Sequence, residues 1–144
     1  MKTYGNYDKY FYFRTVTDED NDDDFDASLI IPVGNITGLE PYSGISNIRL
    51  WFEGGQGRAN AFDFYPYDRA ANLNSYVDLA VTRGKIKEVM EELVSAMNAG
   101  PHHDGVIVVR DEVTTDYDGS VRSAVTLSND ITAVSNIEIF IIIS

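Results

Sequence analysis

Apolar and polar residues alternate along several short segments, a pattern that predicts a chain built mainly of β-strands. Segments 48–53 and 76–81 follow the period of two expected of a strand with one buried face. Segment 10–16 is rich in aromatic and β-branched residues, which favour strands. The continuous run 106–109 (VIVV) is typical of a strand that is covered on both of its faces.

One amphipathic helix is predicted between about residues 83 and 98. Its apolar stripe, at spacings of three and four, consists of Ile86, Val89, Met90, Leu93, Val94 and Met97. Thr82 can serve as the N-cap, and Gly100 followed by Pro101 ends the helical pattern. Burying such a stripe contributes on the order of 10 kcal/mol, more than helix propensity supplies, so the helix is expected to pack on a sheet.

Turn signals divide the remaining segments and complete the expected fold. Glycine, asparagine and proline mark turns between residues 34 and 44, and Gly54–Gly57 predicts a hairpin loop before a return strand at 59–65. Asp118–Gly119 predicts a hairpin turn between segments 112–115 and 120–127. The prediction is one α+β domain over residues 1–144, with a largely antiparallel, strongly twisted or barrel-like sheet of about eight strands. The helix is inserted after the fifth strand.

Charge excludes several classes of partner. The chain has 144 residues, a net charge of −12 and no cysteine, so disulfides and cysteine-based metal sites are absent. This acidity disfavours nucleic-acid backbones and anionic membrane surfaces, and no apolar stretch is long enough for a membrane span. The first residues lack the apolar region of a classical secretion signal. The expected setting is therefore the cytoplasm or a virion.

Residues 18–26 (DEDNDDDFD) form the sharpest acidic segment and are predicted to be an exposed loop. Asp18, Asp20 and Asp22 match the first positions of a calcium-binding loop. The match then ends, because Asp23 replaces the required glycine and Leu29 replaces the bidentate glutamate. A solvated acidic loop is the better interpretation, and weak binding of divalent cations remains open.

No motif predicts catalysis or a cofactor. The histidines, His102 and His103, are adjacent, so they point apart on an extended chain, and no third metal ligand is specified. Gly54–Arg58 precedes no helix and lacks the end of a phosphate-binding loop, while Thr82–Lys85 is better explained by helix capping. The expectation is a protein that is not an enzyme, with no catalytic residues, cofactor or firm metal site.

The C-terminal segment 137–143 (IEIFIII) predicts a terminal strand that is apolar on both faces. Ile139, Ile141 and Ile143 can face one side of that strand. A two-sided apolar strand at a chain end favours pairing with another subunit, so these three isoleucines are the predicted oligomer interface. A different structural feature would favour the binding of a ligand or nucleic acid. That feature is a basic concavity with exposed aromatic residues, lined by Arg49, Arg58 and Arg83.

Four segments together resemble small uncharacterised proteins of marine phage and marine environmental sequence: DASLIIPVGNITGLEP, NIRLWFEGG, YVDLAVTRGKIKEVMEELVSAMN and DITAVSNIEIF. The resemblance spans most of the chain but contains no diagnostic motif, and it implies a virion or assembly role without catalytic residues. The sequence therefore predicts a self-associating structural or assembly protein. The alternative is a small β-barrel module that binds a small ligand or single-stranded nucleic acid.

Overall fold

A computed structural model describes residues 9–24, 26–53, 74–98 and 105–139. The strands in chain order are β1 (Lys9–Arg14), β2 (Ser28–Pro32), β3 (Ile36–Pro41), β4 (Asn47–Glu53), β5 (Asn74–Val81), β6 (Gly105–Asp111), β7 (Val125–Thr126) and β8 (Ile131–Glu138). The α-helix α3 (Ile86–Asn98) follows β5, and two short 3-10 helices are η2 (Glu19–Asn21) and η3 (Val33–Asn35). The α+β class agrees with the sequence prediction, and the described residues form eight strands, the approximate number predicted.

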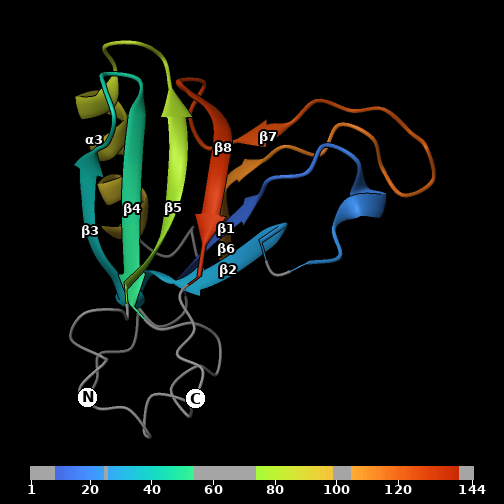
Figure 1. The fold of residues 1–144 in the computed structure, drawn as a ribbon, viewed down its shortest axis with the longest axis horizontal. Coiled ribbons are helices and arrows are strands. Elements are labelled where there is room, and N and C mark those ends of the chain that lie inside the picture. Colours follow the sequence, from blue (N-terminus) through green and yellow to red (C-terminus); the bar gives the residue numbers. More distant parts are fainter. Residues whose placement is uncertain (1–8, 25, 54–73, 99–104, 140–144) are drawn as a thin grey trace, which may run out of the picture.

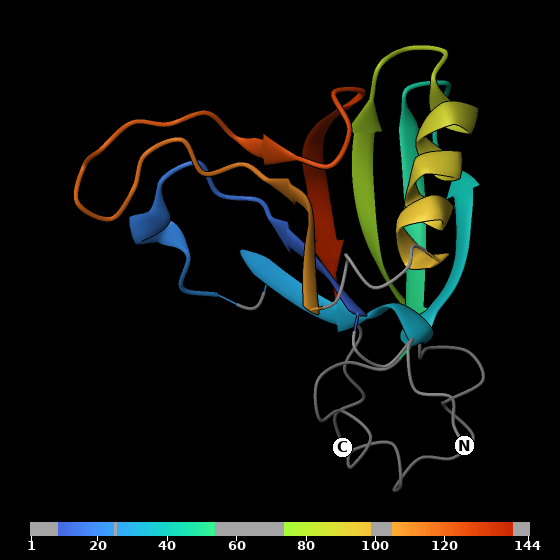
Figure 2. The same ribbon diagram turned by 180° about the vertical axis from the view of Figure 1, so that it is seen from behind.

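The strands form two four-stranded sheets, in the orders β2-β1-β6-β7 and β3-β4-β5-β8. Among the described strands, β1 pairs with β6 in parallel and all other neighbouring strands pair antiparallel. In Figure 1, β3, β4, β5 and β8 stand side by side, and α3 lies behind β3 and β4. The other sheet extends away from them toward two long loops, as the view from behind in Figure 2 also shows.

One hydrophobic core joins the helix and the inner faces of both sheets. Phe11 and Phe13 of β1 are buried in the same cluster as Leu50 of β4 and Val89 and Leu93 of α3. Because the inward residues of a strand share one side, α3 and the sheet β2-β1-β6-β7 cover the same face of the sheet β3-β4-β5-β8. The opposite face of each sheet is its outer face.

Several local predictions need correction. Within the described residues the two sheets stay separate and open, so they do not form the predicted barrel-like sheet. β7 has two residues and pairs with the end of β6. Residues 36–41 form β3 where turns were expected, and the predicted return strand at 59–65 lies outside the described residues. The last described strand covers 131–138, so it begins before the predicted start at 137, after a turn at Ser128–Asp130. Residues 140–143 of the predicted terminal strand lie outside the described residues.

The helix begins at Ile86, three residues later than the predicted position of about 83. A turn with Gly84 at φ 81° precedes it, so Thr82 is not its N-cap. The buried side of the helix is formed by Val89, Leu93 and Ala96. Val94, predicted to be in the core, is exposed because it lies one residue, or about 100° of helical rotation, away from Leu93.

Replacing Leu93 with alanine tests this orientation. Leu93 is fully buried, so Leu93→Ala should lower the free energy of unfolding by about 2–5 kcal/mol through lost transfer energy and a residual cavity. Val94→Ala, on the neighbouring exposed position, should change it by less than about 0.5 kcal/mol. Urea denaturation measures both values, and equal losses would contradict the observed helix orientation.

Candidate functional site

The outer face of the sheet β2-β1-β6-β7 carries two rows of apolar side chains. One row places Tyr10 between Pro32 and Val106, and the next places Tyr12 between Ile30 and Val108. These six residues, Tyr10, Tyr12, Ile30, Pro32, Val106 and Val108, are called the apolar face. Val106 is 53% exposed and Ile30 is 42% exposed, while the other four are half-buried.

The apolar face differs from what the sequence predicted for these strands. Segment 106–109 was expected to be covered on both faces, but only Ile107 and Val109 are buried in the core. The same two-sided pattern occurs in β1 and β2, where Phe11 and Ile31 are buried while Tyr12 and Ile30 point outward. Three adjacent strands thus have the composition of a doubly covered sheet, although the described chain buries only one of its faces.

An ionic network built on Arg14 borders the apolar face. Arg14 Nε and Nη2 donate to the two carboxylate oxygens of Asp111 at 3.0 and 2.8 Å, a bidentate pair between β1 and β6. Arg14 Nη1 also approaches Asp22 at 3.2 Å and Glu19 at 3.4 Å. Arg122 adds contacts of 3.3 Å to Asp111 and 2.8 Å to Asp116. The network therefore joins the end of β1, the acidic segment and the loop after β6.

A shift of register between β1 and β6 positions Asp111. The pairing changes between Tyr12 and Phe13, after which Arg14 lies opposite Asp111. Such bulges redirect the side chains that follow them. Burial by itself raises the pKa of Asp111, but hydrogen bonds from Arg14, the Val113 amide and Arg122 outweigh it and lower that pKa below its ordinary value.

The acidic segment takes part in this network, although most of its described residues are exposed. Asp22 accepts hydrogen bonds from Arg14 and from the Ser28 hydroxyl, and it is half-buried. Asp18 caps η2 by accepting from the Asp20 amide at 3.0 Å. Among the described residues, no three histidine or acidic side chains converge to hold a metal ion. Weak cation binding by Asp18, Asp20 and Asp22 stays a prediction.

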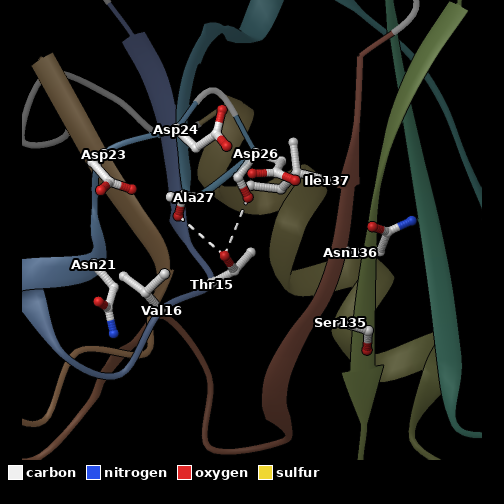
Figure 3. Close-up of a pocket in the computed structure, with 10 residues that line it drawn as sticks. All are labelled: Thr15, Val16, Asn21, Asp23, Asp24, Asp26, Ala27, Ser135, Asn136 and Ile137. Carbon is white, nitrogen blue, oxygen red and sulfur yellow. Dashed lines mark hydrogen bonds between the residues drawn. The ribbon is translucent and has the colours of Figure 1, made fainter.

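A pocket of about 330 Å³ lies between the acidic segment and β8. Asp23, Asp24 and Asp26 line one side, and Ser135 and Asn136 line the other, as Figure 3 shows. The Thr15 hydroxyl donates to the backbone carbonyl oxygens of Asp26 and Ala27, each at 3.2 Å. The pocket is open to solvent, and its lining is acidic. Among the described residues, the lining carboxylates do not form a metal-binding group.

The remaining residues that the sequence singled out are the interface isoleucines, the histidines and the three arginines, and within the described residues they do not come together in one site. Ile139 follows β8 and packs against the core, whereas Ile141, Ile143, His102 and His103 lie outside the described residues. Arg49 pairs with Asp78, Arg83 is exposed before α3, and Arg58 lies outside the described residues, so the basic concavity is not assembled by the described part of the chain. No described helix is long and apolar enough to cross a membrane.

Two features escaped sequence reasoning for different reasons. The apolar face could have been predicted, because three strands contain runs that are apolar at every position: YFYF in β1, LII in β2 and VIVV in β6. No local pattern in the sequence could predict the Arg14–Asp111 pair, since the two residues are 97 positions apart. The strand alignment that joins them comes only with the fold.

Arg14→Met is expected to lower the free energy of unfolding by about 3 kcal/mol, because it leaves the buried Asp111 carboxylate with fewer partners. Lys87→Met, which removes the exposed pair with Glu91, should have no measurable effect. Chemical denaturation near neutral pH compares the two variants. A loss no larger than that of Lys87→Met would contradict the stabilising role of the network.

The contribution of Asp111 to the free energy of unfolding should decrease at low pH. The pKa of Asp111 is lower in the folded chain than in the unfolded chain, so its stabilisation is complete above the unfolded value near 3.8. That contribution is lost as the pH falls through the lower folded pKa. The difference in stability between wild type and Arg14→Met should therefore shrink below about pH 4. A difference that stays constant down to about pH 2 would contradict this assignment.

Comparisons with protein-family models, with curated protein sequences and with solved structures found no match for this chain. The geometry of the chain itself therefore carries the functional argument.

Proposed function

We propose that this protein is a non-enzymatic structural or assembly protein that self-associates through the apolar face. The observation that carries the proposal is the exposure of Val106 in a strand whose sequence is apolar on both sides. Burying apolar surface in a contact makes the free energy of association more favourable by roughly 25 cal/mol for each Å² that is removed from water. The virion setting is supported by the sequence resemblance alone.

Electrostatics favour this face as the place of contact. The chain carries 23 acidic residues and a net charge of −12, so two copies repel each other over most of their surfaces. The apolar face contains no charged residue, because its six members are tyrosine, isoleucine, proline and valine. Two copies can approach there without bringing unpaired carboxylates into a dry contact.

A twofold contact between sheets suits this geometry. Sheet faces pack about 10 Å apart with interdigitating side chains, and a twofold axis places the same patch on both sides. Stable dimers bury about 800 Å² on each partner, so the six residues would form the centre of the contact. Ser28 and Arg14, in the next row of the sheet, would lie at its rim. The interface predicted at Ile139, Ile141 and Ile143 is a separate proposal.

Light scattering after size exclusion, between about 10 and 200 µM, tests the proposal. Wild type should show a mass that rises from monomer toward dimer with concentration. Val106→Glu should raise the dissociation constant by at least about 100-fold, because dimerisation would bury an unpaired carboxylate. Val121→Glu makes the same charge change at a residue that is 82% exposed on the distant loop, and it should behave as wild type.

Thermal melts establish that both variants are folded, since each substitution lies at an exposed position. A monomeric wild type at about 200 µM would overturn the proposal. So would a Val106→Glu variant that dimerises as strongly as Val121→Glu.

A further inference from the structure

The outer face of the second sheet, β3-β4-β5-β8, has a different chemistry. The strand register aligns Glu40 with Arg49 and Asp78 in one row, and Trp51 with Tyr76 and Glu138 in the next. This face points away from α3 and from the other sheet, because the inward residues of the same strands form the core. It is called the aromatic face and comprises these six residues together with Tyr42, which follows β3.

Arg49 shows which group the aromatic face accommodates. Its guanidinium lies 3.5 Å from the centre of the Tyr42 ring and 3.6 Å from the centre of the Tyr76 ring. Asp78 accepts two hydrogen bonds from it, at 2.8 and 3.0 Å. The guanidinium thus combines contacts with two aromatic rings and a bidentate pair with a carboxylate. The face therefore already holds one arginine of its own chain.

The Arg49 guanidinium also lies 5.5 Å from the centre of the Trp51 ring, and Trp51 offers a cation a further aromatic surface beside those two rings. Its indole N–H donates to Glu40 at 2.7 Å, and its ring meets Tyr76 edge to face with centroids 5.2 Å apart. A Cβ atom at Gly38 would lie 4.0 Å from the indole Cδ1, so the ring extends over a residue that has no side chain. A carboxylate on the indole N–H increases the negative potential of the ring, and tryptophan is already the strongest cation–π acceptor.

The charges of the aromatic face complement a cation. Glu40, Asp78 and Glu138 oppose the one positive group, Arg49, which leaves a net charge of −2 among the named residues. The chain as a whole is also strongly acidic. An approaching cation gains long-range attraction and then finds rings and carboxylates on adjacent strands, whereas an anion is repelled.

We propose that the aromatic face binds an arginine side chain presented by a segment of a partner protein. The guanidinium stacks on Trp51, and Glu138 and Glu40 supply the opposing charge. Arginine fits better than lysine because its planar, weakly hydrated group stacks on aromatic rings while it donates hydrogen bonds. This surface is distinct from the apolar face, so its function does not depend on self-association.

Trp51 is the only tryptophan in the chain, so its fluorescence reports directly on this surface. The probe is the acetylated and amidated peptide Gly-Arg-Gly-Arg-Gly, which contains no aromatic residue. At about 150 mM NaCl it should change the Trp51 emission saturably, with a dissociation constant of about 0.1–1 mM. The corresponding lysine peptide should bind at least about threefold more weakly.

Matched variants separate this surface from general attraction to an acidic chain. Glu138→Gln should weaken the fluorescence-detected binding about three- to tenfold. Asp23→Asn removes the same charge from the acidic segment and should weaken it less than about twofold, because salt screens distant charges. Tyr42→Ala, which opens the stack around Arg49, should also weaken binding, whereas Tyr117→Ala at an exposed tyrosine of the distant loop should not.

Trp51 emission that stays constant up to about 5 mM arginine peptide would overturn the proposal. Equal effects of Glu138→Gln and Asp23→Asn, or equal affinity for the lysine peptide, would overturn it as well. Val106→Glu should keep wild-type affinity for the peptide, so failure of self-association and failure of this proposal are distinguishable.

Discussion

The parallel pairing of β1 with β6 is the contact on which the rest of the structure depends. It joins two strands that are far apart in the sequence, with Arg14 and Asp111 separated by 97 positions, and it brings Phe11 and Phe13 into the same core as Ile107. Forming it closes a loop of most of the chain, and the entropic cost of closure rises only slowly with loop length. The Arg14–Asp111 pair at the end of these strands then anchors the acidic segment and the loop after β6.

The two sheets share one core but present opposite chemistries to solvent. The outer face of β2-β1-β6 is apolar, while that of β3-β4-β5-β8 is aromatic and charged around Arg49 and Asp78. Each chemistry follows from the residues on alternate positions of the strands, because the inner positions of both sheets are already apolar. The described part of this acidic chain thus presents an uncharged apolar face, for which we propose self-association, and an acidic aromatic face, for which we propose binding of a cation.

Much of the fold could be predicted from local pattern, and the errors have physical causes. The helix was located because Val89 and Leu93 recur with helical spacing, but its start was placed too early since Thr82 resembles a cap. β3 was missed because Gly38 and Pro41 are turn-forming residues that an edge strand tolerates. The separation into two sheets was also missed, because strand order depends on pairings between distant segments.

By itself the sequence determined the α+β class, the approximate position of the helix and the net charge of −12. It also determined which residues are apolar in β1, β2 and β6, since composition is local information. Only the tertiary structure decided that Ile107 turns inward while Val106 stays exposed, and that Arg49 lies between Tyr42 and Tyr76. Burial and pairing are properties of contacts between distant segments, so a strand apolar on both sides does not reveal which side the chain itself will cover.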